Sequence, residues 1–244
     1  MSAIRVDSLT KRYGDVTALN GLTMTVEAGE FYGLLGPNGA GKTTTIEILT
    51  GQTAPDQGSA SVLGIDPIAD PVDLRQAVGI LPEKEAPPSL MTPREYLRFT
   101  GAVRELPADR IDDGIATWAE RLAFAENLDV LATDLSRGHQ QKVMIAAAFL
   151  HEPAVVFIDE PLANLDPIVQ EQVKSFLATY RADGNTVLLS THNVDVGADL
   201  CTRVAILQTG ELIEEIRPDE IGPDRTLLDE FIQQTNGPDL PSHA

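Results

Sequence analysis

A run of eight residues near the start of the chain carries the clearest chemical signal. It consists of Gly36, Pro37, Asn38, Gly39, Ala40, Gly41, Lys42 and Thr43, and Thr44 follows it. The run fits the pattern G-x-x-x-x-G-K-[ST] between an apolar segment and a segment of helical character. In this pattern the glycines let backbone N–H groups face phosphate oxygens, the lysine reaches the β and γ phosphates, and the threonine hydroxyl is a magnesium ligand. These residues therefore predict a site for a nucleoside triphosphate and Mg²⁺.

Two adjacent carboxylates form the second chemical signal. Asp159 and Glu160 follow an apolar run of residues 154–158. Ligands of open α/β sheets bind at the carboxyl ends of the strands, and neighbouring strand residues point to opposite faces. We therefore expect Asp159 to hold Mg²⁺, and Glu160 to orient or deprotonate the attacking water. The structural alternative is an acidic pair that only ends a strand.

The elements that must position these residues follow from the hydrophobic pattern. Residues 4–9 and 22–26 alternate between apolar and polar, which predicts two half-buried strands. Residues 31–35, 154–158 and 186–189 are short apolar runs typical of buried parallel strands, and residues 43–49 have helical character. Residues 82–153 are mostly helical in pattern, and Thr92, Pro93 and Glu95 form a predicted capping box. The pattern predicts an α/β protein with an N-terminal antiparallel β region and an inserted helical subdomain.

These patterns also suggest boundaries. We expect the core that binds the triphosphate to comprise residues 1–83 and 154–215, and the helical subdomain to comprise residues 84–153. Residues 216–244 are acidic and rich in proline, so we expect a C-terminal tail with frayed last residues.

Composition excludes several classes of protein. The chain has 244 residues, 43% of them hydrophobic, so it can bury a core and is not intrinsically disordered. Its longest apolar run, residues 143–150, is too short to cross a membrane, and no leader precedes the first predicted strand, so we expect a cytoplasmic protein. The single cysteine, Cys201, is expected to be a small buried residue.

The net charge of −19 argues against nucleic acid as a partner, because it would repel the phosphate backbone. Lysine is scarce, with 5 residues against 13 arginines. An acidic, lysine-poor surface suits a cytosol with molar salt, where the Debye length is about 3 Å. The alternative is an ordinary acidic cytosolic protein.

Over residues 4–215, the sequence resembles the nucleotide-binding subunits of ATP-binding cassette (ABC) transporters. Leu135, Ser136, Arg137, Gly138 and His139 resemble the LSGGQ signature, with arginine for its first glycine and histidine for its glutamine. The resemblance implies a P-loop NTPase (RecA-like) core. It also implies that Ser136 and Gly138 bind the γ phosphate held by a second subunit, so that two cassettes form a dimer around two nucleotides. From the residues alone, Ser136 could equally be the N-cap of a helix whose apolar face includes Val143 and Ala146.

The resemblance assigns three smaller matches. Tyr13 occupies the place of an aromatic that stacks on adenine, although an exposed tyrosine is otherwise unremarkable. Asp166 is the retained residue of a loop that couples the two subunits, in which Ala163 replaces the usual serine. His192 occupies the place of a histidine that contacts the γ phosphate, although a lone histidine is more often structural.

Glu83 is a departure from the family. Most members have glutamine at this place, where it touches Mg²⁺ and the attacking water and relays to the membrane subunit. A carboxylate is a stronger ligand for Mg²⁺ than an amide is, but it adds negative charge beside a triphosphate. Glu83 is therefore a candidate metal ligand and catalytic residue whose effect on turnover is open.

The resulting hypothesis is an ATPase subunit that uses ATP and Mg²⁺ and drives a separate integral membrane permease from the inner face of the cell membrane. The signature variant and the lack of an extended regulatory domain favour export, and a homodimer of cassettes is expected. A soluble ABC-type ATPase that regulates a ribosome or a DNA-bound complex is the alternative from another class. A P-loop kinase would leave the signature match unexplained.

Overall fold

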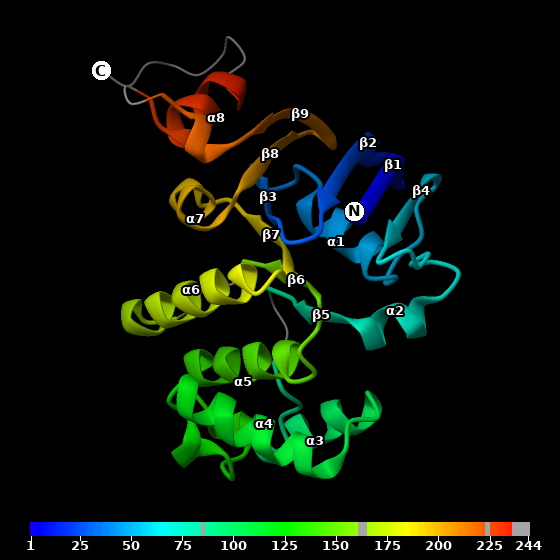
Figure 1. Cartoon of the computed structure of the whole chain (residues 1–244). Helices are drawn as coiled ribbons and strands as arrows, with labels where there is room; N and C mark the ends of the chain where they lie inside the picture. The colour runs from blue at the N-terminus through cyan, green and yellow to red at the C-terminus, as the bar shows by residue number, and fades with distance from the viewer. Residues whose placement is uncertain (84–85, 161–164, 223–224, 236–244) are drawn as a thin grey trace.

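Parallel strands and the loops at their carboxyl ends organise the molecule. The computed structural model describes residues 1–83, 86–160, 165–222 and 225–235. The strands are β1 (Ser2–Tyr13), β2 (Val16–Glu27), β3 (Phe31–Leu35), β4 (Gln57–Val62), β5 (Val78–Leu81), β6 (Val155–Asp159), β7 (Thr186–Thr191), β8 (Arg203–Gln208) and β9 (Glu211–Ile216). The α-helices are α1 (Lys42–Leu49), α2 (Pro71–Ala77), α3 (Pro93–Val103), α4 (Ala108–Arg121), α5 (Arg137–Phe149), α6 (Pro167–Ala182), α7 (Val194–Leu200) and α8 (Leu227–Thr235). Figure 1 shows their arrangement.

The central sheet has the strand order β5-β6-β7-β3-β8-β9, and its pairs are parallel except β8 with β9. Its register aligns the carboxyl ends of four strands. Leu81 of β5 pairs with Ile158 of β6, Asp159 pairs with Ser190 of β7, and Leu35 of β3 pairs with Thr191. The segments that follow β3, β5, β6 and β7 therefore leave the sheet at the same edge. The predicted parallel core is confirmed.

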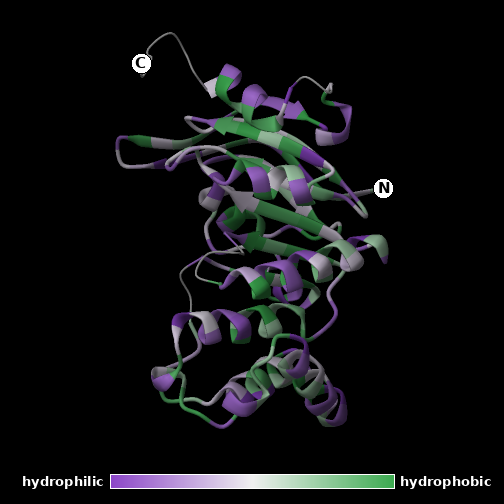
Figure 2. Cartoon of the chain, turned by 90° about the vertical axis from the view of Figure 1, so that its left-hand side faces the viewer, coloured by the Kyte–Doolittle hydropathy of each residue, from purple (hydrophilic) through white to green (hydrophobic). Residues whose placement is uncertain are grey.

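The two faces of this sheet belong to two separate cores. Phe31 and Leu35 face a core shared with α4, α5 and α6, whereas Tyr32 and Leu34 face a core shared with α1 and β1. All five residues of β3, and all five of β6, are buried. Burial on both faces explains why these strands read as continuous apolar runs rather than as alternating ones. Figure 2 shows the hydrophobic residues concentrated in these central strands.

A second, three-stranded antiparallel sheet with the order β2-β1-β4 lies beside α1 (Figure 1). It confirms the predicted N-terminal antiparallel region. Its strands β1 and β2 have 12 residues each, longer than the alternating segments predicted. The β1–β2 pair has register shifts between Leu9 and Lys11 and between Lys11 and Arg12, so the regular pairing does not continue from the predicted segment to the end of β1.

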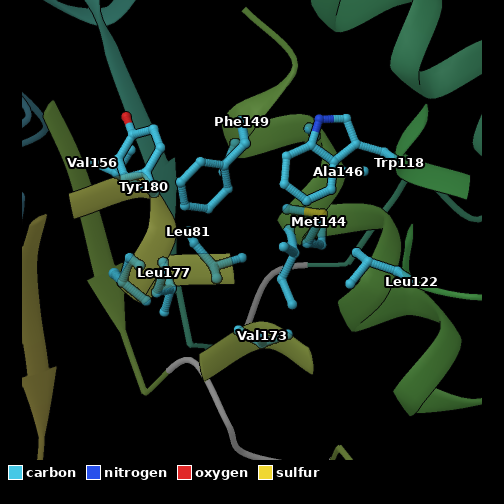
Figure 3. Packing of buried hydrophobic residues seen from close by; sticks show 14 of the residues in the cluster. Leu81, Trp118, Leu122, Met144, Ala146, Phe149, Val156, Val173, Leu177 and Tyr180 are labelled. Atoms are coloured by element: carbon cyan, nitrogen blue, oxygen red, sulfur yellow. The ribbon is translucent and has the colours of Figure 1, made fainter. Parts of the chain in front are cut away.

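Helices α3, α4 and α5 form the helical part, drawn below the sheet in Figure 1. The Thr92 side chain accepts a hydrogen bond from the Glu95 backbone N–H, and the Glu95 carboxylate accepts one from the Thr92 N–H, so the predicted capping box is present. An aromatic cluster joins this part to α6 (Figure 3). The Phe149 ring lies 5.6 Å from that of Trp118 and 5.1 Å from that of Tyr180, as ring centroids. These contacts fix α5 against both neighbours.

The C-terminal segment differs from the tail predicted. Residues after Ile216 include α8, whose Leu227 is buried in the core under α7. Leu227 and Phe231, one turn apart on α8, pack against this core, which the acidic composition of the segment did not predict. The expectation of frayed last residues concerns residues 236–244, which lie outside the described part. Cys201 is buried, as predicted. Among the described residues, no helix is both long and apolar enough to span a membrane.

Candidate functional site

The phosphate-binding run forms the loop between β3 and α1. Gly39 and Gly41 have φ values of 83° and 103°, in the left-handed region that glycine adopts without steric cost. Gly36 is required for another reason, because a Cβ there would lie 2.4 Å from the carbonyl oxygen of Leu207. The loop thus passes close to β8 and then turns sharply into α1. Its Pro37, Asn38 and Gly39 are exposed, and Ala40 is buried.

Lys42, at the start of α1, is buried beneath this loop. Its Nζ donates hydrogen bonds to the carbonyl oxygens of Gly36, at 2.6 Å, and Pro37, at 3.1 Å. Burial lowers the pKa of the Lys42 ammonium, and the carboxylates of Glu160, Asp159 and Glu83 oppose that shift. A pocket of about 210 Å³ lies over the loop. It is lined by Val16, Ala18, Asn38, Gly39, Ala40, Gly41, Lys42, Thr43 and Thr44.

Thr43 and Asp159 form the oxygen pair expected for a magnesium site. The Thr43 hydroxyl donates a hydrogen bond to Asp159 Oδ2 at 2.9 Å, and Asp159 is only 4% exposed. Mg²⁺ prefers hard oxygen ligands and is commonly held by one or two protein oxygens together with phosphates and water. The donor set of this pair fits that ion. The described residues contain no cluster of three His, Cys, Asp or Glu side chains that would suit a metal held by protein ligands alone.

Glu160 leaves the strand in a different direction from Asp159. Its φ is 51°, an uncommon value for a residue other than glycine, and its N–H donates to the Ser190 carbonyl oxygen at 3.0 Å. Its Oε1 accepts hydrogen bonds from the backbone N–H of His192, at 2.9 Å, and lies 2.5 Å from His192 Nδ1. Because an ionised carboxylate only accepts, Nδ1 is the protonated nitrogen in this contact. The two predicted acids therefore have different partners.

Glu83 follows β5 at the same edge of the sheet. Its carboxylate acts on Lys42 electrostatically together with Asp159 and Glu160. The side chain is exposed. The structure thus places Glu83, the residue that departs from the family pattern, where its charge acts on the phosphate-binding Lys42.

Tyr13 lies at the end of β1, opposite Val16, which lines the pocket. Its ring is 47% exposed, and its hydroxyl donates to Glu47 Oε2 at 3.4 Å. Lys11 Nζ lies 5.3 Å from the ring centroid. An exposed ring beside the pocket is available for stacking.

Ser136, Gly138 and Asp166 are not joined to the phosphate loop by any hydrogen bond between described residues. Ser136 is the N-cap of α5, where its hydroxyl accepts from the His139 N–H. Asp166 is the N-cap of α6 and accepts from the Val169 N–H at 3.0 Å. Both side chains are exposed at helix starts, and Gly138 is half-buried in the first turn of α5. Ala163 lies outside the described residues.

Two further residues contact the site but were not predicted from the sequence. The first is Thr191, whose hydroxyl donates to Glu160 Oε2 at 3.1 Å. Its only sequence signal is its position immediately before His192. The second is Gly210, whose N–H donates to the Ala40 carbonyl oxygen at 3.1 Å. Nothing in the local sequence links residue 210 to the phosphate loop.

Comparison with known proteins identifies a family model and relatives that match most of the chain. Residues 19–163 match the family model described as ABC transporter. The chain is 36% identical over 217 residues to the Nod factor export ATP-binding protein I of Rhizobium meliloti, covering 88% of this chain and 64% of that protein. It is 31% identical over 240 residues to the "Probable multidrug ABC transporter ATP-binding protein YbhF" of Escherichia coli, covering 95% of this chain and 41% of that protein. The chain thus spans less than two thirds of each of these two relatives.

Solved structures agree with the fold. The structure of an ATP binding subunit of an ABC transporter is 28% identical, with a TM-score of 0.89, over 96% of this chain and all of that one. A dimeric ATP-binding cassette bound to ADP and phosphate has a TM-score of 0.80 at 22% identity, over 88% of this chain and 98% of that one. At that identity the second comparison supports the architecture alone.

Proposed function

This chain belongs to the ABC transporter family of ATP-binding proteins, and from this premise we propose that it hydrolyses ATP to ADP and phosphate and drives a separate membrane permease. The observation that carries the proposal is the convergence of Lys42, the Thr43–Asp159 pair and Glu160 at one edge of the sheet. Catalysis of phosphoryl transfer is mostly positioning and charge stabilisation, and this edge supplies groups for both.

Each side chain then has a distinct task. Lys42 and the N–H groups of its loop bind the phosphates, and Thr43 and Asp159 would hold Mg²⁺. The bound ion supplies positive charge against the developing negative charge. Glu160 accepts a proton as the water oxygen forms its bond to the γ phosphorus and the bond to the β–γ bridging oxygen breaks. Tyr13 stacks on the adenine, and His192 contacts the γ phosphate through Nε2 while Nδ1 holds Glu160.

The working unit we propose is a dimer. Ser136 and Gly138 lie in the helical part, on the opposite face of the sheet from α1. Because Ser136 lies across the sheet from α1, we propose that it binds the γ phosphate held by a second cassette and not the one held by its own chain. Asp166, exposed at the start of α6, would lie at the contact between the two copies.

The permease is proposed from the family together with the names of the relatives. The Rhizobium protein is named for export of Nod factor and the Escherichia coli protein for multidrug transport. Export is therefore the direction we favour, with this chain bound peripherally to the cytoplasmic face of the membrane through its permease.

Glu160→Gln tests the ATPase assignment directly. The carboxamide cannot accept the proton from water, so kcat for phosphate release should fall about 100-fold or more. ATP affinity should persist because Lys42 and its loop are untouched, and the trapped ATP should hold a dimer detectable by light scattering. Glu120→Gln, on the exposed side of α4, is the matched control and should retain the wild-type rate. Equal turnover by Glu160→Gln and the control would remove Glu160 from catalysis.

A further inference from the structure

Thr191 is the last residue of β7, and its side chain is 2% exposed. Its hydroxyl makes two hydrogen bonds. It donates to Glu160 Oε2 at 3.1 Å and accepts from the Asn193 N–H at 3.0 Å. The first bond connects the ends of two parallel strands, because β6 and β7 are paired through Asp159 and Ser190.

The orientation of the Glu160 carboxylate depends on donors from Thr191, the last residue of β7, and from His192, which follows it. The left-handed backbone at Glu160 ends the extended conformation of β6 at Asp159. The carboxylate would otherwise rotate about three side-chain torsions, which is costly to fix without partners. His192 holds Oε1 and Thr191 holds Oε2, so both oxygens have a donor and the plane of the carboxylate is defined.

We propose that Thr191 is a positioning residue whose hydroxyl fixes the Glu160 carboxylate in the orientation that activates water. This inference rests on the proposed function, since it gives Glu160 the role of general base. Geometry decides general-base efficiency because the base must lie within hydrogen-bond reach of the proton that it abstracts. A positioned carboxylate meets that condition in every binding event, whereas a rotating one meets it in a fraction of them.

The competing explanation is structural, because Thr191 also accepts the Asn193 N–H where α7 begins. The strand itself provides a matched control. Thr186, at the opposite end of β7, is also 2% exposed, and its hydroxyl accepts from the Gly29 N–H at 2.9 Å. Thr→Val is nearly isosteric at both positions and removes a buried hydroxyl from each, but only Thr191 touches Glu160.

The experiment compares Thr191→Val, Thr191→Ser and Thr186→Val for kcat, KM for ATP and melting temperature. Thr191→Val should lower kcat about tenfold or more, as expected for loss of a hydrogen bond to a charged group, with KM unchanged. Thr191→Ser keeps the hydroxyl and should recover most of the rate. Thr186→Val should match Thr191→Val in melting temperature while keeping the wild-type kcat. Equal kcat for both valine variants would overturn the proposal.

A double variant separates positioning from any other effect. If Thr191 acts through Glu160, adding Thr191→Val to Glu160→Gln should change the residual rate by less than about twofold. A full additional loss in the double variant would show that Thr191 acts elsewhere and would overturn the inference. If Glu160→Gln alone leaves turnover intact, the general-base role of Glu160 fails, and if the wild-type protein releases no phosphate from ATP, the proposed function itself fails. Both outcomes are distinguishable from a failure of the Thr191 inference, in which Glu160→Gln is slow and Thr191→Val is not.

Discussion

At the scale of single residues, Lys42 has an unusual charge environment. The carboxylates of Glu160, Asp159 and Glu83 all favour its charged form, and burial disfavours it. One cation therefore faces three acidic side chains at the place where a triphosphate is proposed to bind. Glu83 is the one that the family pattern does not require.

Glu83→Gln restores the family's usual residue at this place. Removing one negative charge beside the γ phosphate reduces repulsion, so we expect higher turnover and a shifted magnesium dependence. The measurement is phosphate release over a magnesium titration at saturating ATP. The exposed Glu120→Gln on α4 again serves as the control for loss of one carboxylate elsewhere. If both the rate and the magnesium dependence stay at wild-type values, Glu83 has no part in the site.

At the scale of elements, His151 connects the end of α5 to the start of β5. Its Nε2 donates to the Val78 carbonyl oxygen at 3.1 Å, and its Nδ1 is buried without a hydrogen-bond partner. Burial, followed by the positive charge of Arg104, lowers the pKa of His151 to about 4. The neutral imidazole therefore fits this junction, and a proton on Nδ1 would have no acceptor.

The pH dependence of stability follows from this depressed pKa. The folded-state pKa lies below the usual value of about 6.5, so protons favour the unfolded state, and the stabilisation present above that value is lost as the pH falls toward 4. His151→Gln keeps an N–H donor for Val78 but does not titrate. Urea unfolding from about pH 7 to about pH 5 should therefore show a shallower loss of unfolding free energy in the variant. If the unfolding free energies of the wild type and of His151→Gln fall by the same amount over this pH range, the result would contradict this linkage.

Many of the helices and strands, and the phosphate loop, could be predicted from the sequence. The apolar run of β3 gave its bounds, and Thr92 with Glu95 marked the start of α3, because these signals lie within a few neighbouring residues. The phosphate loop was recognisable for the same reason. The Thr191–Glu160 bond was not, because it depends on the β6–β7 register between residues 31 positions apart. Helix α8 was missed because its burial depends on α7, whereas its composition is that of a polar tail.

At the scale of the whole molecule, the net charge of −19 is the dominant electrostatic feature. This value already counts the 18 Lys and Arg residues, some of which form surface ion pairs such as Arg94–Asp129 and Arg98–Asp112. Such exposed pairs contribute little to stability and are themselves screened by salt. Repulsion among the remaining carboxylates therefore opposes both the folded state and the association of two copies.

A salt series tests the proposal that this protein is adapted to molar salt. The Debye length falls from about 30 Å at 0.01 M to about 3 Å at 1 M salt, so repulsion across the domain is removed. Melting temperature and phosphate-release rate should both rise between about 0.1 and about 2 M KCl at fixed free magnesium. An ordinary acidic protein would lose ATP affinity as salt competes for Lys42. A flat or falling melting temperature would exclude adaptation to high salt and leave the ATPase assignment intact.

The contact of Gly210 with the phosphate loop has a consequence for how the protein is made. Its N–H binds Ala40, its carbonyl oxygen accepts from the Asn20 N–H, and a Cβ on Gly41 would meet Ala18. The loop is thus enclosed by a turn that is synthesised roughly 170 residues later, a delay of about 10 to 35 s at ordinary translation rates. A nascent chain on the ribosome therefore carries the phosphate-binding sequence long before it has the enclosed loop, and ATP can first assist folding of this loop only after Gly210 has been synthesised.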